Sequence, residues 1–182
     1  MGLRLKISNT NHLFFVTTTV VDFIQVFNED RYSQIVIDNM NFYRERYGFK
    51  LMAYVIMPEH IHLIVWTKED TSISSLMRDF KKYTSVQIKR KILADDKKKL
   101  ISIFQKNASG YKDQEFKFWM DRFDRLIIYT PEVFQQKVDY IHFNPVRRNL
   151  VKDMLDWKYS STRNYYLNDH SLIRVDNEVV LI

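Results

Sequence analysis

The sequence contains no cysteine, so it can form neither a disulfide bond nor a metal site built on thiolate ligands. It has only three glycines, and none of them belongs to a glycine-rich loop of the kind that wraps phosphate groups. No apolar run reaches the ~20 residues that a membrane-spanning helix needs, and residues 1–6 lack the apolar core of a signal peptide. We therefore expect a cytoplasmic protein without a membrane partner.

The composition is that of an ordinary globular protein with a basic surplus. Hydrophobic residues make up 46% of the 182 residues and charged residues 27%, which suits a single domain over 1–182 with a sizeable core. Lysine and arginine number 28 against 22 aspartates and glutamates, so the net charge is +6. Such a surplus favours a polyanionic partner, and nucleic acid before a membrane surface.

Two histidines separated by one residue stand in a short run that otherwise has the composition of a buried strand. Side chains on a strand alternate between faces, so His60 and His62 point the same way while Ile61 points the other way. Their backbones would lie about 7 Å apart, because a strand rises ~3.3 Å per residue. Neutral imidazole is a common metal ligand, so the pair predicts a site for one divalent cation. The alternative is two ordinary histidines on a half-exposed strand.

The predicted elements follow the order strand, helix, strand, strand, helix, strand, helix. That order is typical of an α+β, ferredoxin-like (βαββαβ) fold, an antiparallel sheet with helices on one face. The final helix is an addition to this unit at its C-terminal end. The expected strands are 12–21, 49–57, 60–65 and 125–130, and the expected helices are 30–47, one from 71 or 72 onward, and 131–144.

Local signals set the expected ends and faces of these elements. Asp30 can cap the first helix, and Gly48 ends it. Pro145 is expected to stop the last helix at Asn144, because the residue before a proline avoids the helical region. Alternation along the second strand predicts one face made of Leu51, Ala53, Val55 and Met57.

Positive charge is concentrated in the second helix and the loop after it. Residues 78–99 include nine basic and three acidic residues, a local charge of +6. We interpret the outward side of this helix as a nucleic-acid contact, and the alternative is a solvated surface, the usual fate of a charge run. The candidate contacts are Arg78, Lys81, Lys82, Lys89 and Arg90.

Two further stretches carry candidate DNA contacts. Residues 116–123 interleave aromatic and basic side chains, so Trp119 could stack on an unpaired base while Arg122 holds a phosphate. The alternative for Trp119 is a place in the hydrophobic core. Arg147 and Arg148, just after the last helix, are candidates for phosphate binding.

Two segments lack a regular pattern. Residues 94–115 contain clustered charges and small polar residues, so we expect an inserted, mobile excursion rather than a domain boundary. The apolar residues around Phe104 could support one short helix within it. Residues 167–182 are predicted to form an irregular C-terminal tail.

The last helix offers a partner for the histidine pair. Tyr140 and Asn144 are four residues apart and therefore share one side of the helix. A tyrosine can attack phosphorus as a nucleophile, and an amide oxygen can complete a metal shell. Tyr83 and Gln87 have the same spacing on the basic helix, and their chemistry hardly differs from that of the first pair.

Two motifs in the chain resemble a known group of enzymes. Residues 57–62 (Met-Pro-Glu-His-Ile-His) and 138–146 (Val-Asp-Tyr-Ile-His-Phe-Asn-Pro-Val) resemble the single-tyrosine transposases of the HUH superfamily. Within it the sequence is most similar to the REP-associated tyrosine transposases, over residues 14–166. The long segment 94–115 is the main departure from shorter members.

The resemblance implies a role for each site residue. His60, His62 and Asn144 would be the ligands of a Mg²⁺ or Mn²⁺ ion, and Tyr140 would be the nucleophile. The implied substrate is single-stranded DNA near imperfect hairpins, cleaved through a 5′-phosphotyrosine with release of a 3′-hydroxyl that can attack in the reverse step. In some relatives the tyrosine helix serves the partner's active site, so the chain is expected as a monomer or a homodimer.

Two other functions fit the same residues. One is a nucleic-acid-binding module on the same fold that has lost catalysis and keeps the basic helix for binding alone. The other is a metal phosphodiesterase that uses water and forms no covalent adduct. A covalent DNA adduct that survives denaturation distinguishes the strand transferase from both.

Overall fold

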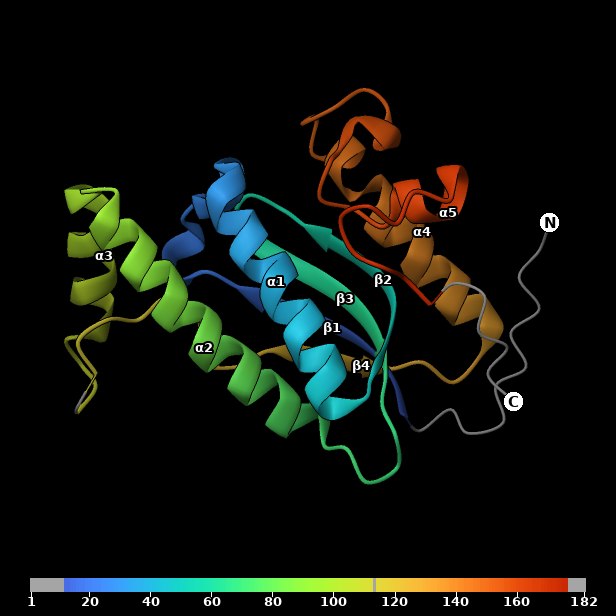
Figure 1. The fold of residues 1–182 in the computed structure, drawn as a ribbon, viewed down its shortest axis with the longest axis horizontal. Helices are drawn as coiled ribbons and strands as arrows, with labels where there is room; N and C mark the ends of the chain where they lie inside the picture. Colours follow the sequence, from blue (N-terminus) through green and yellow to red (C-terminus); the bar gives the residue numbers. More distant parts are fainter. Residues whose placement is uncertain (1–11, 113, 177–182) are drawn as a thin grey trace.

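The computed structural model describes residues 12–112 and 114–176, and the strands in these ranges form one four-stranded antiparallel sheet. The strands lie in the order β2-β3-β1-β4, so β1 and β3 are central (Figure 1). Together with the helices they follow the predicted ferredoxin-like order, and this prediction is confirmed. The strands are β1 (Leu13–Thr19), β2 (Lys50–Ile56), β3 (His60–Trp66) and β4 (Asp124–Ile127).

Helices cover both faces of the sheet. α1 (Asp30–Tyr47) and α2 (Ile73–Ala94) pack side by side on one face (Figure 1), and α4 (Pro131–Arg147) packs on the other. Each face has its own core, so Ile61 of β3 belongs to the first core and Ile64 to the second. The remaining helices are α3 (Lys98–Ala108), α5 (Thr162–Leu167) and the 3₁₀ turns η2 (Val21–Phe23), η3 (Val26–Asn28) and η4 (Met154–Asp156).

α2 forms as its sequence predicts. The hydroxyl of Ser72 caps it by accepting a hydrogen bond from the N–H of Ser75 at 3.3 Å. Neither α2 nor any other helix in the described ranges is both long and apolar enough to cross a membrane. The stripe that α2 buries at three- and four-residue spacing consists of Ile73, Leu76, Met77, Phe80, Thr84, Ile88 and Ile92.

A bulge in β2 changes the face that its first residues reach. The pairing of β2 with β3 shifts register between Leu51 and Ala53. A bulge inserts one unpaired residue, and the side chains on its two sides then fall out of simple alternation. Leu51 consequently packs in the core under α1 and α2, whereas Ala53 and Val55 pack under α4. The predicted single face is therefore wrong for Leu51.

The first helix spans the predicted residues, but its N-cap lies one residue earlier than predicted. Asp30 is the first residue of α1, and Glu29 occupies the N-cap position without a side-chain cap. The predicted end of the helix is confirmed, because Gly48 adopts the left-handed conformation with φ +63° and ψ +27°. Glycine reaches that conformation without a steric penalty.

The tyrosine-bearing helix does not stop before its proline. α4 continues through Pro145 to Arg147, so the predicted end at Asn144 is wrong. Pro145 has no N–H to donate, so the helix loses the one hydrogen bond that this residue would have made to the carbonyl of Ile141. The turn keeps its shape through bonds from Arg148 N–H to the carbonyl of Asn144 at 3.1 Å and from Leu150 N–H to that of Pro145 at 2.9 Å.

The segment 94–115 contains a packed helix. Phe104 of α3 is fully buried, and its ring centroid lies 5.1 Å from that of Phe116 and 5.2 Å from that of Phe118. The short helix predicted around Phe104 is confirmed. Mobility was expected from the polar composition, but the three aromatic rings attach α3 to the core.

The chain beyond α5 packs along the outer side of β2. Within the predicted tail 167–182, Asp176 forms two hydrogen bonds with Leu51: its N–H donates to the carbonyl at 2.8 Å and its carboxylate accepts from the N–H at 2.9 Å. Residues 177–182 lie outside the described residues. The predicted tail therefore begins with a segment that supports the sheet.

Replacing Phe104 by alanine should lower the free energy of unfolding by about 3–5 kcal/mol, because a fully buried aromatic side chain leaves a cavity. Denaturant unfolding followed by circular dichroism measures this loss. Phe42 of α1 is 53% exposed and is the matched control, with an expected loss of about 1 kcal/mol or less on replacement by alanine. Equal losses in the two variants would show that Phe104 does not anchor α3.

Candidate active site

The pairing of β1 with β3 brings polar side chains to the face that α4 covers. Thr17 lies across from His62 in this antiparallel pair, and Thr19 lies across from His60. Because the two histidines share a face, their Nε2 atoms come within 3.1 Å of each other. The structure thus brings the two imidazoles together as the alternation of a strand predicts.

Each imidazole is oriented by a contact on its other ring nitrogen. His60 Nδ1 lies 2.9 Å from Oε1 of Glu59, and His62 Nδ1 lies 2.8 Å from Oγ1 of Thr17. An ionised carboxylate can only accept a hydrogen bond, so Nδ1 of His60 carries the hydrogen and Nε2 presents its lone pair. Outer partners of this kind fix the tautomer of histidines that bind metals.

Burial lowers the pKa of both imidazoles and so favours their neutral form. Desolvation lowers the pKa of His62 to about 3, and repulsion from His60 and Lys137 acts in the same direction. Desolvation also lowers the pKa of His60, although the nearby Glu59 carboxylate opposes the shift. Neutral imidazole is the form that binds a cation.

The donors fit a divalent cation. Two ligands on adjacent corners of an octahedron with ~2.1 Å bonds lie about 3 Å apart, and the Nε2 atoms of His60 and His62 are 3.1 Å apart. The described residues contain no cluster of three or more His, Cys, Asp or Glu suited to a metal, so a third protein ligand, where there is one, would be of another type. The amide of Asn144 is a candidate, because it is 6% exposed and its side chain makes no hydrogen bond within the described ranges.

α4 brings Tyr140 to the histidines because its apolar stripe lies on the sheet. Tyr140 stands beside this stripe, and its ring centroid lies 5.1 Å from that of His62 and 5.9 Å from that of Phe15. Phe15 also stacks on His62 at 5.3 Å. The buried residues of the stripe are Phe134, Val138 and Ile141.

Cationic side chains lie close to Tyr140. Lys137 Nζ and the guanidinium of Arg147 are each 5.7 Å from the centre of the tyrosine ring. Arg148 forms an ion pair with Glu59 at 3.0 Å. Lys137 was missed by the sequence analysis, and its place three residues before Tyr140 on the same side of the helix is the signal that could have found it.

His60, His62, Tyr140 and Arg148 line one hollow of about 410 Å³. Asn144 does not line this hollow. Thr17 was missed by the sequence analysis, since the strand pairing that places it beside His62 is not visible in one sequence. A tyrosine hydroxyl beside a cation site suits transfer of a phosphoryl group. The residues of the hollow that bear on this chemistry are Thr17, Glu59, His60, His62, Tyr140 and Arg148.

Comparison with known proteins identifies the family. The family model described as "Transposase IS200 like" matches residues 10–123, more than half of the chain. The chain belongs to this transposase family. The match includes both histidines of the hollow and ends before α4, so it does not cover Tyr140 or Asn144.

Two curated relatives carry the name REP-associated tyrosine transposase. The one from Haemophilus influenzae is 28% identical over 146 residues, which is 76% of this chain and 77% of that protein. The one from Escherichia coli K12 is 30% identical over 115 residues, which is 62% of this chain and 54% of that protein, so this match spans about half of the relative. These relatives carry the name of the group that the two sequence motifs resemble.

A solved structure shares the fold of this transposase. It is a REP-associated tyrosine transposase bound to a REP hairpin, and it aligns with a TM-score of 0.65 at 22% sequence identity. The alignment covers 100% of this chain and 94% of that one. The α+β architecture is therefore that of a known transposase.

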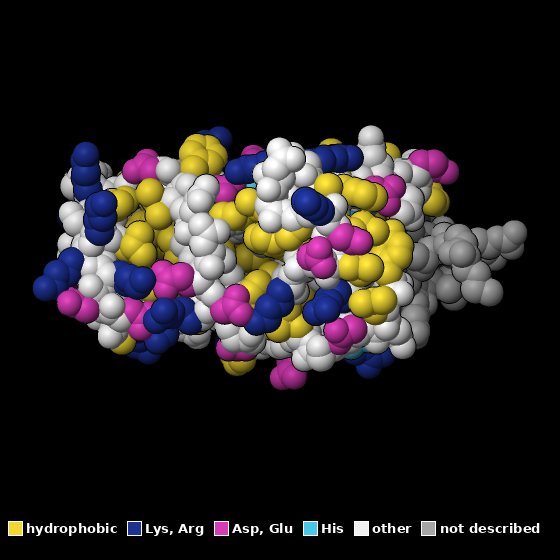
Figure 2. All heavy atoms as spheres, turned by 90° about the horizontal axis from the view of Figure 1, so that it is seen from above, with side chains coloured by type: hydrophobic (Ala, Val, Ile, Leu, Met, Phe, Trp, Pro, Cys, Tyr) yellow, Lys and Arg dark blue, Asp and Glu magenta, His cyan; other side chains and the backbone are white. Residues whose placement is uncertain are grey.

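The basic helix of this transposase lies on the opposite face of the sheet from the hollow. Arg78, Lys82 and Arg90 of α2 are exposed, and in the view of Figure 2 lysines and arginines are frequent at the end where α3 lies. Lys81 is different, because its ammonium donates to the carbonyls of residues 120–122 at 2.7 to 3.2 Å. Desolvation lowers the pKa of Lys81 to about 8. Its contacts attach that segment to α2.

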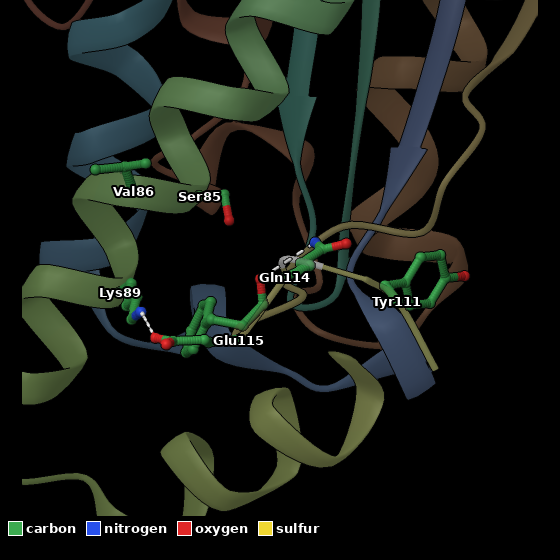
Figure 3. Close-up of a pocket in the computed structure, with 7 residues that line it drawn as sticks. Ser85, Val86, Lys89, Tyr111, Gln114 and Glu115 are labelled. Carbon is green, nitrogen blue, oxygen red and sulfur yellow. Dashed lines mark hydrogen bonds and ion pairs between the residues drawn. The ribbon is translucent and has the colours of Figure 1, made fainter. Parts of the chain in front are cut away.

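Lys89 borders a second hollow between α2 and the segment after α3 (Figure 3). This hollow of about 630 Å³ is larger than the one beside the histidines. Lys89 Nζ lies 3.7 Å from the carboxylate of Glu115 and 5.7 Å from the centre of the Phe116 ring. None of its lining residues in the described part of the chain is a histidine, so the smaller hollow is the candidate active site.

The aromatic stretch 116–123 divides between core and surface. Trp119 is 5% exposed, and its Nε1–H donates to Oγ1 of Thr84 at 2.9 Å. The structure therefore places Trp119 in the core, which was the alternative to base stacking. A ring that stacks on a base must be accessible. Arg122 is exposed, and its side chain remains a candidate for phosphate.

The second tyrosine pair lies away from the histidines. Tyr83 is 47% exposed on α2, and Oε1 of Gln87 accepts a hydrogen bond from Asn39 at 2.9 Å. Both belong to the helix that covers the other face of the sheet. Of the two pairs, the one on α4 contributes a tyrosine to the hollow of the histidines.

Acid should destabilise the metal-free protein from about pH 6.5 downward. Desolvation lowers the pKa of His62 to about 3 and that of His142 to about 4, so the unfolded chain binds protons that the folded chain does not. Between the unfolded and folded pKa values, each such histidine costs about 1.4 kcal/mol of stability per pH unit. Thermal unfolding in the presence of a chelator measures this slope. His142→Gln should flatten it between pH 6.5 and 4, and an unchanged slope would contradict the role of burial.

Proposed function

We propose that this transposase cleaves and rejoins single-stranded DNA beside a hairpin through a covalent bond between Tyr140 and a 5′-phosphate. The observation that carries the proposal is the hollow that Tyr140 shares with His60 and His62, where the ring centroids of Tyr140 and His62 are 5.1 Å apart. The names of the relatives and the REP hairpin bound to a protein of the same fold support this class of substrate.

The transfer exchanges one phosphodiester bond for another. The Oη atom of Tyr140 forms a bond to phosphorus while the bond from phosphorus to the 3′-oxygen breaks. The phenol loses its proton and the departing oxygen gains one, so the products are a 5′-phosphotyrosine and a free 3′-hydroxyl. Attack by a 3′-hydroxyl on the phosphotyrosine rejoins a strand and restores Tyr140. No water is consumed, which distinguishes this reaction from hydrolysis.

His60, His62 and Asn144 are the proposed ligands of a Mg²⁺ or Mn²⁺ ion. When bound, the ion would withdraw charge from the scissile phosphate. The protein's part is to hold two neutral imidazoles with converging Nε2 atoms and to limit their contact with water, as the 4% exposure of His62 allows. Asn144 would add an amide oxygen from the helix that carries Tyr140.

Two sets of basic side chains are proposed to hold the DNA. Around the hollow, Lys137, Arg147 and Arg148 would bind the phosphates next to the cleaved bond, since each lies beside Tyr140 or Glu59. On the opposite face, the exposed side of α2 would bind the backbone of the hairpin or its flanking strand. The second set is Arg78, Lys82, Lys89 and Arg90, together with Arg122, which belongs to the segment whose carbonyls Lys81 binds.

Tyr140→Phe should abolish the covalent DNA adduct, because the variant has no oxygen to attack phosphorus. Fold and hairpin binding should stay within about threefold of the parent, since phosphate contacts supply most of the affinity. The measurement is a denaturing gel of labelled hairpin DNA incubated with the protein and Mn²⁺.

Tyr83→Phe is the matched control and should form adduct within a few fold of the parent. An adduct that persists in Tyr140→Phe and disappears in Tyr83→Phe would reverse the assignment. Binding without any adduct in the parent would favour the module that has lost catalysis. Cleavage without an adduct would favour hydrolysis by water.

The affinity for DNA should fall steeply with salt if α2 contacts the backbone. The logarithm of the association constant should decrease with the logarithm of salt concentration by roughly 0.7 per single-strand phosphate neutralised. Replacing Lys82, Lys89 and Arg90 together by glutamine should therefore reduce the slope by about 2. Fluorescence anisotropy at several salt concentrations measures it. A slope equal to that of the parent would show that this side of α2 is only solvated surface.

A further inference from the structure

A buried carboxylate stands at the turn that leads into the histidine strand. Glu59 is 3% exposed and lies between β2 and β3. Its carbonyl accepts a hydrogen bond from Val20 N–H at 2.8 Å, and the carbonyl of Pro58 accepts one from Phe27 N–H at 2.9 Å. The backbone of the turn is thus held by the segment after β1, and the side chain has little freedom to move away.

The carboxylate of Glu59 contacts two parts of the site at once. Its Oε1 lies 2.9 Å from Nδ1 of His60 and 3.0 Å from a guanidinium nitrogen of Arg148. Its Oε2 is buried and has no hydrogen-bond partner among the described residues. A buried carboxylate is costly unless it is paired, so both contacts compensate for its removal from water.

These contacts join the histidine strand to the end of the tyrosine helix. Arg148 is the residue at the C-terminal cap of α4, one step beyond the last helical residue. Its side chain is 48% exposed and borders the same hollow as Tyr140 and His60. One carboxylate therefore contacts both a histidine and the residue that caps the helix carrying Tyr140.

We propose that Glu59 is a positioning residue that prepares His60 for the cation and holds the C-terminal end of α4 against the histidine strand. It keeps the hydrogen of His60 on Nδ1, so the lone pair of Nε2 points toward His62. It also holds Arg148 at the hollow, where an entering phosphate can take over part of its bonding. This inference rests on the proposed function for the identity of the reaction, but its first consequence concerns metal binding without DNA.

The test compares Glu59→Gln with the parent in two assays on the full chain. The first is a titration with Mn²⁺ alone, in the absence of DNA. The second is formation of the covalent adduct with hairpin DNA over a range of Mn²⁺ concentrations. Loss of an outer partner of a metal-bound histidine typically weakens metal binding by about 10- to 100-fold. We expect that loss for Glu59→Gln, with adduct formation partly restored by higher Mn²⁺.

Glu29→Gln is the matched control. The carboxylate of Glu29 also contacts two cations, Arg31 at 3.0 Å and Lys97 at 2.9 Å, but lies outside the hollow. It should leave both the Mn²⁺ affinity and the adduct unchanged. Arg148→Gln should reduce adduct formation while Mn²⁺ affinity stays within a few fold of the parent, because Glu59 still contacts His60.

The outcomes separate this inference from the proposed function. An Mn²⁺ affinity in Glu59→Gln equal to that of the parent overturns the role of Glu59, as does a parent that binds no Mn²⁺. If the parent forms no adduct while Glu59→Gln still weakens Mn²⁺ binding, the proposed function fails and the positioning of His60 stands.

Thermal unfolding shows whether Glu59→Gln folds. If it does not fold, a second variant provides the test. Glu59→Asp keeps the charge but shortens the side chain by one carbon, so it should also weaken Mn²⁺ binding. Full Mn²⁺ affinity in a folded Glu59→Asp variant overturns the inference.

Discussion

The antiparallel pairing of β1 with β3 is the constraint on which both the core and the site depend. β3 is buried on both faces, and its residues alternate between the core under α1 and α2 and the face under α4. The register that sets Thr17 opposite His62 also places Ile61 in the first core. A slip of one residue would turn both histidines into that core and remove them from Tyr140. Stability and chemistry thus depend on the same hydrogen bonds.

Much of this arrangement was predictable because its causes are local in the sequence. The histidine pair follows from the two-residue period of a strand, and the buried stripe of α2 follows from the period of a helix. Gly48 and Ser72 mark helix ends through backbone chemistry that a single residue determines. The order of the elements then left few ways to form the sheet.

The differences arise where the outcome depends on neighbours that are distant in sequence. Leu51 changes faces because of a bulge opposite β3, next to a carboxylate supplied by Asp176. Lys81 looked like part of a basic surface, but three carbonyl oxygens surround its ammonium. Tryptophan is a residue type that stacks on bases, but Trp119 lies in the core and its Nε1–H donates a hydrogen bond to Thr84. Local spacing and residue type do not reveal partners that lie far away in the sequence.

The choice between the two tyrosines also depends on the three-dimensional structure. Tyr140 and Tyr83 each lie four residues before a residue with an amide side chain, so the sequence pattern does not show which of them is the nucleophile. The sheet separates them, because α4 and α2 cover opposite faces. Three-dimensional position, and not the reactivity of the side chain, makes Tyr140 the candidate.

The separation of the two faces also limits how a polymer can run over the molecule. The rim along β2 is occupied, since Ile56 N–H donates to Tyr159 at 2.9 Å and Asp176 brackets Leu51. The opposite rim is β4, with only four residues, of which Asp124, Arg125 and Leu126 are exposed. A strand of DNA in contact with both the hollow and α2 would therefore pass either around β4 or over the strand ends, where Phe23 and Gln25 line the hollow. Along the β4 edge such a path would cross the shortest strand of the sheet, which presents only four residues.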